Sequence, residues 1–349
     1  MNDFSSRLIA WQKQYGRHDL PWQNTTDPYA IWVSEIMLQQ TQVSAVIGYY
    51  QRFMTRFPTI AALANATQDE VLQHWSGLGY YSRARNLHNA AQTIMNEHKG
   101  KFPQAFDTIQ TLPGIGRSTA AAIASFAFNQ VQTILDGNVK RVLARHFAIA
   151  GWPGSPKIEK SLWAMAESLL PKTDMVAYTQ GLMDLGATLC TRNKPACTAC
   201  PLSSTCAALA QDRVHALPTP KPKKIIPIKR TIMLILLHGD EVMLQKRPSS
   251  GIWGGLWSFP EVENHQGITY ALSQLGVIAH PDRALPILNH AFTHFKLQIT
   301  PLIMCVSQQK PHTKETGTLW LPLSDTMNAA IPAPVRTIVK QILRETRSK

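Results

Sequence analysis

The sequence predicts a mainly α-helical domain followed by a smaller α+β domain. Three observations support this fold class: apolar residues repeat at helical spacing in the first part of the chain, a stretch rich in proline and lysine follows, and strand-like segments come after it. The 349 residues suffice for two domains, and 44% hydrophobic residues suffice for sizeable cores. We therefore expect domains at 1–212 and 230–349, joined by a linker at 213–229.

The helical part shows its periodicity most clearly in two segments. One carries Val43, Val46, Ile47, Tyr50 and Phe53, and the other carries Val139, Val142, Leu143 and Phe147. Spacings of three and four residues place these side chains on one face of a helix. Glycine-rich turns and prolines separate such segments, so several helices are expected in 1–212.

The linker and the second domain differ in composition from the helical part. Four prolines among lysines between 213 and 229 exclude a helix and favour an extended linker. Segments 231–237 and 241–246 flank His238-Gly239-Asp240 and predict a β-hairpin. Further strands are expected at 295–306 and 318–321, and helices at 270–275 and 335–344.

The charge of the chain points to a polyanionic partner. Thirty-five Lys and Arg against 22 Asp and Glu give a net charge of +13, which suits nucleic acid or an anionic membrane surface. No strongly basic amphipathic helix stands out, so nucleic acid is favoured, while a basic protein with no such partner is the alternative. The longest apolar runs are far shorter than the roughly 20 residues of a membrane helix, and no signal peptide is evident. We expect a cytoplasmic, nucleoid-associated monomer that binds no membrane.

Four of the five cysteines form a compact group. Cys190, Cys197, Cys200 and Cys206 follow the spacing C-x6-C-x2-C-x5-C. In a cytosolic chain such a group indicates a metal site before disulfides, and four thiolates suit either zinc or a [4Fe–4S] cluster. The fifth, Cys305, lies in an apolar segment and is expected to be a buried thiol.

The string Leu112-Pro113-Gly114-Ile115-Gly116-Arg117 lies between two helical patterns. Pro113 ends the first helix, and Gly114 and Gly116 permit a tight turn with open backbone N–H groups. A helix is expected to begin at Arg117, so its positive dipole end lies at the turn and offers a phosphate site. Most two-glycine turns only connect helices, but the complete string is more specific.

Two acidic residues are candidates for chemistry on a glycosidic bond. Such chemistry uses one carboxyl group to protonate the leaving group and another to stabilise the sugar cation. Glu35 lies among apolar residues on a predicted helix, where it either points to solvent or is buried with a raised pKa. Asp136 precedes a predicted helix, where it is either an ordinary N-cap or a carboxylate kept ionised by the helix end.

Several motifs in order resemble the MutY-type adenine DNA glycosylases of the endonuclease III-like helix-hairpin-helix superfamily. They are the string from Ser34 to Val43, the segment 77–85, the hairpin 112–117, the string 135–139 and the cysteine loop. The resemblance implies that the four cysteines hold a [4Fe–4S] cluster. It also implies duplex DNA as partner, with adenine opposite 8-oxoguanine or guanine, and a phosphate contact by Gly114, Gly116 and Arg117.

The resemblance also assigns roles to individual residues. Glu35 protonates adenine, and Asp136 stabilises the sugar cation, either electrostatically or through a covalent intermediate. Asn138 orients Asp136. Tyr80 is the wedge that enters the base stack, and Gln40 lies beside the lesion.

The residue after Arg117 separates the subfamilies. Relatives that also nick the strand have a lysine there, whose amine forms a Schiff base with the sugar. This chain has Ser118, so we expect hydrolysis by water, little lyase activity and at most a minor catalytic role for Ser118. The alternative is a bifunctional glycosylase/lyase acting on oxidised pyrimidines, against which Ser118 and the second domain argue. A non-enzymatic iron–sulfur protein that binds DNA is disfavoured by Glu35 and Asp136.

Residues 230–349 resemble the MutT-like (Nudix-fold) domain of the same family. A Nudix hydrolase needs the segment Gly-x5-Glu-x7-Arg-Glu-x2-Glu-Glu to hold magnesium, and Glu261 is followed by no such acidic run. We therefore expect a base-reading surface without hydrolase chemistry. Thr293 and His294 match the family's Phe-Ser-His loop, which contacts 8-oxoguanine, with threonine in place of serine.

Overall fold

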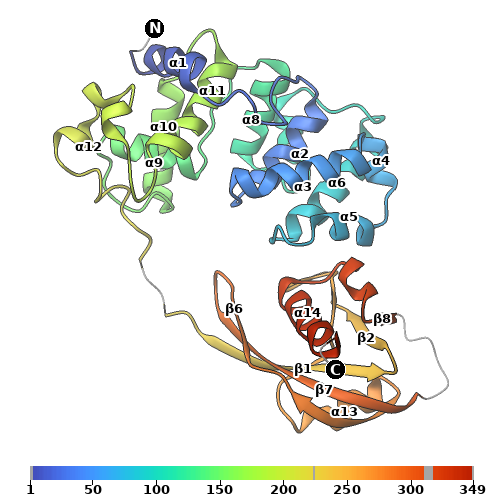
Figure 1. Ribbon diagram of the computed structural model, residues 1–349. Coiled ribbons are helices and arrows are strands. Elements are labelled where there is room, and N and C mark those ends of the chain that lie inside the picture. Colours follow the sequence, from blue (N-terminus) through green and yellow to red (C-terminus); the bar gives the residue numbers. More distant parts are fainter. Residues whose placement is uncertain (1–2, 223–224, 310–316, 348–349) are drawn as a thin grey trace. The chain divides into compact units, whose positions relative to one another are not determined.

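The computed structural model describes residues 3–222, 225–309 and 317–347 (Figure 1). Lys223 and Lys224 of the predicted linker lie outside the described residues. The chain forms two compact units, Met1–Asn65 with Asn86–Lys223 and Ala66–Arg85 with Lys224–Lys349. No helix in the described ranges is long and apolar enough to cross a bilayer.

The first unit is helical. Its helices are α1 (Asp3–Tyr15), α2 (Pro28–Leu38), α3 (Val43–Arg56), α4 (Ile60–Asn65), most of α6 (Ser82–Glu97), α7 (Phe106–Thr111), α8 (Arg117–Phe128), α9 (Gly137–His146), α10 (Pro156–Ser168), α11 (Met175–Asp184) and α12 (Ala207–Ala210). A π-helical turn, η1 (Leu185–Leu189), and two short 3-10 turns, η2 (Cys197–Ala199) and η3 (Ser203–Thr205), lead through the cysteine loop. The predicted helices around Val43 and Val139 are confirmed as α3 and α9.

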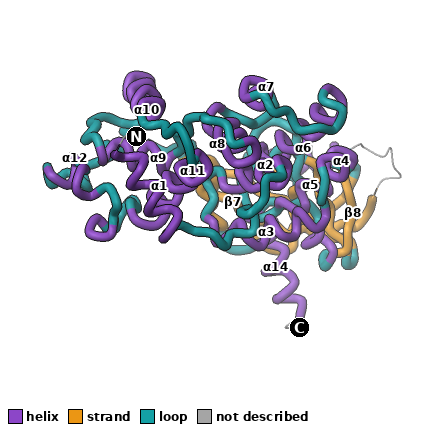
Figure 2. Tube along the Cα trace, turned by 90° about the horizontal axis from the view of Figure 1, so that it is seen from above, coloured by secondary structure: helices purple, strands orange, loops and turns teal. Residues whose placement is uncertain are grey.

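Helix α2 lies inside this unit, beside α8 in both views of the chain (Figures 1 and 2). Its start is fixed because the Asp27 side chain accepts a hydrogen bond from the Tyr29 N–H, with Pro28 at the first helical position. Most of its residues are buried, so it is apolar all round instead of on one face. This placement brings any polar residue of α2 into the interior.

A hydrophobic core of the first unit forms where five helices, α1, α8, α9, α10 and α11, pack together. Its buried residues include Leu8, Ala121, Leu143, Leu162 and Leu182. Helix α9 begins at this core because the Asp136 carboxylate caps it, accepting from the Val139 N–H at 2.8 Å. The capping residue is therefore held between the core and the first turn of the helix.

The turn before α8 has the geometry expected of Gly114. Its φ is +78°, and a Cβ there would lie 2.7 Å from the Cβ atom of Asn86. Both constraints require glycine at this position. Gly116 differs, since it is the N-cap of α8 with φ −87°, and no side-chain hydrogen bond caps it.

The second unit contains an eight-stranded sheet and helix α5 (Gln68–Trp75). The strands are β1 (Ile228–His238), β2 (Glu241–Lys246), β3 (Trp257–Ser258), β4 (Glu261–Val262), β5 (Val277–Ala284), β6 (Leu288–Ala291), β7 (Lys296–Gln309) and β8 (Thr318–Pro322). The helices that accompany them are α13 (Gly267–Gln274), η4 (Asp325–Asn328) and α14 (Ala333–Arg347). Strand order along the main path is β3-β2-β1-β7-β5.

The two longest strands, β1 and β7, pair in parallel from Ile228↔Lys296 to Leu237↔Cys305. Residues 232–236 of β1 are all buried, so this part of the sheet is covered on both faces. Helix α13 packs on one face against the cluster that includes Leu234, Leu236 and Met304, and α14 lies on the other side of the sheet (Figure 1).

The predicted hairpin is confirmed, since β1 and β2 pair antiparallel with Leu237 opposite Val242. Strands β7 and β8 and helices α13 and α14 also lie where the sequence predicts them. Strands β5 and β6 were not predicted because their residues are mostly exposed, and β5 contains Pro281 beside a register shift. The expectation that Cys305 is buried is wrong: its side chain is exposed, while Met304 and Val306 on the opposite face of β7 are buried.

Candidate functional site

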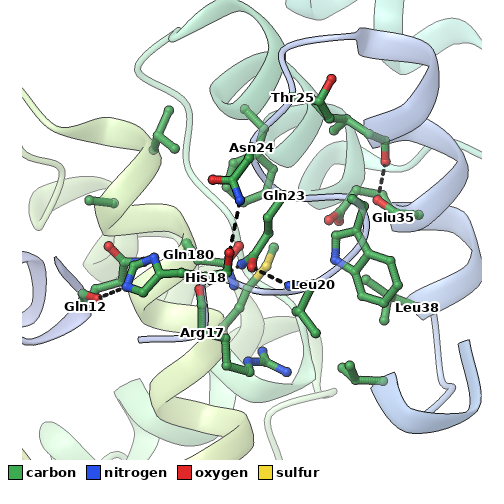
Figure 3. A pocket seen from close by; sticks show the side chains of 18 of the residues that line it. Gln12, Arg17, His18, Leu20, Gln23, Asn24, Thr25, Glu35, Leu38 and Gln180 are labelled. Atoms are coloured by element: carbon green, nitrogen blue, oxygen red, sulfur yellow. Dashed lines mark hydrogen bonds between the residues drawn. The ribbon is translucent and has the colours of Figure 1, made fainter. Parts of the chain in front are cut away.

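The first unit contains a cavity of about 510 Å³ beside α2 and α11. Figure 3 shows Arg17, Gln23, Asn24, Glu35 and Gln180 around it. Apolar side chains, among them Trp22 and Leu38, complete the wall. A cavity of this size, lined by polar and apolar side chains in similar numbers, can hold a small planar molecule with hydrogen-bonding edges.

Glu35 enters this cavity from the buried helix α2, so the alternative of a freely solvated side chain is wrong. It is half-buried, and the surrounding protein raises its pKa to about 8. Burial is the main cause, and the negative charge of Asp136 adds to it. A carboxyl group with this pKa keeps its proton at neutral pH and can donate it.

Asp136 lies near enough to Glu35 to affect its pKa, although 101 positions separate them in the sequence. The pKa of Asp136 is raised above its ordinary value, because burial outweighs the opposing effects of hydrogen bonds from Val139 and Asn138 and of the charges of Arg141 and Lys140. The Asn138 side-chain amide lies 3.5 Å from the second carboxylate oxygen. The two candidate carboxyl groups thus have different surroundings: burial and the charge of Asp136 act on the pKa of Glu35, whereas two cations, Arg141 and Lys140, act on that of Asp136.

The cavity also contains polar residues that sequence reasoning missed. Arg17 donates from its backbone N–H and its Nε to the fully buried carboxylate of Asp184, at 2.9 and 2.6 Å. The Gln180 amide donates to the same carboxylate at 2.8 Å. Asp184 therefore fixes two side chains of the cavity wall. The sequence signal that could have revealed them is the pair Gln180 and Asp184, which lie four residues apart in the largely apolar helix α11.

Ser118 contacts the loop that leads to Asp136. Its hydroxyl oxygen accepts a hydrogen bond from the Leu135 N–H at 3.0 Å. Ser118 therefore ties the start of α8, immediately after the two-glycine turn, to the residue before Asp136. The predicted phosphate-binding turn and the candidate carboxylate are connected through one hydroxyl group.

Arg117 has local partners on α10. Its guanidinium group pairs with Glu167 and lies 4.0 Å from the centre of the Trp163 ring. The side chain is 45% exposed, so it remains accessible at the surface beside the turn. An exposed ion pair of this kind is weak and readily exchanged for a phosphate partner.

The four clustered cysteines line one small cavity of about 30 Å³ together with Arg145. All four are free thiols. Among the described residues, no three His, Cys, Asp or Glu side chains are arranged to hold a single metal ion. Burial raises the pKa of Cys200 to about 11, and the charges of the other three cysteines add to this shift.

Two arginines of α9 hold the cysteine loop. Arg145 is buried and donates to the carbonyl groups of Val214 and Leu217 at 2.9 Å and of Thr191 at 2.7 Å. Arg141 donates to the Cys190 carbonyl and to the Asn138 side-chain oxygen, both at 2.8 Å. One helix thus connects the residues around Asp136 with the loop that carries the cysteines.

Two further predicted DNA-contacting residues have left-handed backbone conformations. Gln40 has φ +57° and Tyr80 has φ +48°, and the Tyr80 side chain is 49% exposed. Non-glycine residues adopt such angles at a cost of about 1–3 kcal/mol, and they are concentrated at functional sites. The Arg83 guanidinium lies 5.6 Å from the centre of the Tyr80 ring and donates to the Gly79 carbonyl at 3.2 Å. The Arg83 side chain therefore restricts the position of the exposed Tyr80 ring.

The second unit has its own cavity of about 430 Å³, to which Tyr80 and Thr293 both belong. Trp253, His290 and Phe292 also line it. His294 is exposed and is not among the lining residues, so of the predicted pair only Thr293 faces this cavity. Tyr80 and Thr293, two predicted DNA-contacting residues from distant parts of the sequence, thus line the same cavity.

Comparisons with known proteins agree with this geometry. Residues 33–168 match the HhH-GPD superfamily of base excision DNA repair proteins, and residues 231–341 match the NUDIX domain. The adenine DNA glycosylase of Buchnera aphidicola subsp. Acyrthosiphon pisum (strain APS) is 39% identical over 338 residues, covering 97% of this chain and 97% of that protein. The adenine DNA glycosylase of Homo sapiens is 35% identical over 405 residues, covering 98% of this chain and 73% of that protein.

The chain belongs to the adenine DNA glycosylase family. Among solved structures, a thermostable thymine-DNA glycosylase is similar with a TM-score of 0.55 and 30% identity, covering 60% of this chain and 95% of that one. An endonuclease III–DNA complex has the same fold, with a TM-score of 0.51 and 21% identity over 61% of this chain and 98% of that one. The predicted family and the two-part fold class are confirmed.

The raised pKa of Glu35 makes stability depend on pH. Its native pKa of about 8 exceeds the ordinary 4.5, so the native state keeps a proton that the unfolded state loses. Stability is full below pH 4.5 and falls through pH 8, by on the order of 3 kcal/mol between pH 5 and 8. Glu35→Gln should lack this fall, which thermal unfolding midpoints at several pH values would measure. The exposed Glu97→Gln is the control, and parallel profiles for Glu35→Gln and the unsubstituted protein would contradict the assignment.

Proposed function

We propose that this protein removes adenine mispaired with 8-oxoguanine or guanine in duplex DNA, by hydrolysis and with little or no strand cleavage. The observation that supports this proposal most directly is the pair of carboxyl groups, Glu35 in the cavity and Asp136 at the start of α9. Their opposite surroundings suit the two tasks that breaking a glycosidic bond requires. A cavity of about 510 Å³ accommodates one base turned out of the helix.

Glu35 is the proton donor of this reaction. Its pKa of about 8 keeps the carboxyl group protonated at pH 7, when adenine must leave. The bond between C1′ of the sugar and N9 breaks, and its electron pair departs with adenine, which takes the proton from Glu35. Water then bonds to C1′ through its oxygen and returns a proton to the Glu35 carboxylate, so the enzyme is restored.

Asp136 stabilises the sugar cation that exists between these steps. The Val139 N–H at 2.8 Å and the positive charges of Arg141 and Lys140 favour its carboxylate form. Asn138 holds the second carboxylate oxygen, and Arg141 fixes Asn138 in turn. The negative charge is therefore kept in place before the substrate arrives, which is the arrangement that lowers a barrier most.

Adenine is recognised by the polar side of the cavity. Arg17 and Gln180 are fixed by the buried Asp184 carboxylate, so their remaining N–H and oxygen groups are presented in a defined direction. The ring of Trp22 and the side chain of Leu38 supply apolar surface for the faces of a base. Fixed polar groups between apolar walls favour a planar heterocycle with hydrogen-bonding edges.

Ser118 supports hydrolysis over strand cleavage. A lyase needs an amine to form an imine with the sugar, and a hydroxyl group cannot do so. The Ser118 hydroxyl instead accepts the Leu135 N–H. The alternative, a bifunctional lyase acting on oxidised pyrimidines, lacks its nucleophile at this position.

DNA contact involves both units. The uncapped N-terminus of α8 after Gly116 offers backbone N–H groups to a phosphate, and the net charge of +13 favours the same partner. The exposed, strained Tyr80 suits a wedge that replaces a flipped base in the stack. Gln40, also strained and exposed, suits a contact to the opposite strand.

Cys190, Cys197, Cys200 and Cys206 would hold a [4Fe–4S] cluster. They line one cavity and carry no disulfide, so four thiolates are available as ligands, and the Arg145 cation beside them would offset part of their negative charge. When bound, the cluster cross-links the loop, and no step of base release needs a redox change. The residues of the chain perform the chemistry.

Exchanging the two carboxyl groups tests the reaction. Glu35→Gln and Asp136→Asn should each lower the single-turnover rate of adenine release at least about 100-fold, because each removes the carboxyl group proposed for its task. Base release is measured on duplexes with adenine opposite 8-oxoguanine, and strands are analysed with and without alkali. The unsubstituted protein should leave the strand intact until alkali is added. Glu97→Gln is the control, and a near-normal rate for either site variant would remove that residue from the mechanism.

The cofactor is tested by chemical analysis of anaerobically purified protein. Iron and sulfide should each approach about four per chain. Cys200→Ser should lose iron, because it removes a ligand, whereas Cys305→Ser should keep it, because Cys305 is exposed and outside the group. Stoichiometric zinc without iron would contradict the proposal.

Reading of the opposite base is tested at Thr293. Thr293 lines the cavity to which Tyr80 belongs, and a placed hydrogen-bonding group discriminates bases by ~1–3 kcal/mol. Thr293→Val should lower the ratio of excision rates opposite 8-oxoguanine and guanine, whereas Thr293→Ser should preserve it. Point variants test this better than removal of 230–349, since residues 66–85 belong to the same unit. An unchanged ratio for Thr293→Val would show that the hydroxyl does not read the lesion.

A further inference from the structure

One half-buried ion pair of the second unit has no part in the function derived so far. The Arg247 Nη1 donates to a Glu261 carboxylate oxygen at 2.6 Å, with side-chain exposures of 22% and 19%. Pairs removed from solvent to this degree need good geometry to persist, so they indicate a constraint more than surface ion pairs do. This pair therefore constrains part of the second unit.

The sequence around Glu261 explains why its carboxylate is available. Gly255 and Glu261 keep the Gly-x5-Glu spacing of a Nudix segment, but Thr269 and Tyr270 occupy the positions of its Arg-Glu pair. Of the acidic positions of that motif, only the one at Glu261 is occupied by an acid in this chain. Instead of neighbouring acids it has Arg247 as its partner.

Arg247 holds the loop that carries Trp253. Its Nε donates to the Ile252 carbonyl at 3.1 Å, and its backbone N–H donates to the Leu256 carbonyl at 2.9 Å. Its guanidinium lies 5.7 Å from the centre of the Trp253 ring. Trp253 has φ +54°, a left-handed conformation that persists only when its surroundings fix it.

The Trp253 ring is buried and supports the loop of Thr293. Its centre lies 5.4 Å from the Phe292 ring and 5.6 Å from the His290 ring. These two rings make an edge contact at 4.7 Å, and Phe292 stacks on Phe295 at the same distance. Thr293 follows Phe292 directly, so the position of its hydroxyl depends on this aromatic group.

We propose that the Glu261–Arg247 ion pair is a positioning device for the loop that carries Thr293, so that Glu261 sets the preference between opposite bases without contacting DNA. The proposal rests on the proposed function, in which Thr293 reads the opposite base. Glu261 fixes the Arg247 guanidinium, Arg247 fixes Trp253, and Trp253 supports Phe292. Loss of the carboxylate leaves Arg247 with its carbonyl partners alone and frees the Trp253 ring to shift.

The test compares excision of adenine opposite 8-oxoguanine and opposite guanine by the full-length protein. Glu261→Gln keeps the side-chain size and removes the charge, and it should lower the ratio of the two single-turnover rates by roughly tenfold. Glu263→Gln, an exposed neighbour, is the matched control and should keep the ratio. The rate opposite guanine should stay within about twofold for both variants, since Glu35 and Asp136 belong to the first unit and Glu261 to the second.

A double-mutant cycle separates positioning from general destabilisation. If Glu261 acts through the Thr293 hydroxyl, Glu261→Gln should change the ratio less than about twofold in a Thr293→Val background. The inference would be overturned if Glu261→Gln lowered the ratio as much in the Thr293→Val background as alone. An unchanged ratio for Glu261→Gln alone would also overturn it. If Glu261→Gln does not fold, Arg247→Lys, which keeps the charge but loses the Nε donor, should show the same loss. An unsubstituted protein that shows no preference for 8-oxoguanine would instead overturn the proposed function.

Discussion

The hydrogen bonds that Arg141 and Arg145 donate from α9 to the cysteine loop constrain most of the first unit. Arg145 alone contacts carbonyl groups from Thr191 to Leu217, so the loop and the end of this unit share one buried cation. Arg141 extends the same network to Asn138, beside the N-cap carboxylate of the helix. The start of α9 and the cysteine loop are therefore held by one hydrogen-bond network, and we expect a change in the loop to alter the support of Asp136.

The proposed chemistry depends on keeping two acids, Glu35 as donor and Asp136 as stabiliser, in opposite protonation states within one site. The sequence offers no difference between a Glu and an Asp that would explain this, because their ordinary pKa values are close. The fold supplies the difference. Glu35 lies on a helix that is buried all round, whereas Asp136 accepts the first N–H groups of a helix and faces Lys140 and Arg141. Position in the fold, more than residue type, assigns donor and stabiliser.

Local signals made much of this predictable from the sequence. Periodicity and turn residues predicted α3, α8, α9 and the β1–β2 hairpin, and the family motifs identified the acids and cysteines. Contacts between distant segments were not predictable, because no local pattern encodes them. The buried Asp184 that fixes Arg17 and Gln180, the grouping of 66–85 with the C-terminal residues, and the parallel pairing of β1 with β7 all depend on tertiary packing. Strand β5, exposed and interrupted by Pro281, gave no periodic signal.

The grouping of residues 66–85 with the C-terminal part of the chain has a consequence for how the protein forms during synthesis. The Ser76 hydroxyl donates to the Ile331 carbonyl across 255 residues, and Lys246 pairs with Asp69. The ribosome makes this segment early, but its partners emerge only after the whole of 86–223 has been translated. Pairings over such distances close slowly. Segment 66–85, which carries Tyr80, therefore gains these contacts at the end of translation, after the helices that precede and follow it in the sequence have had time to fold.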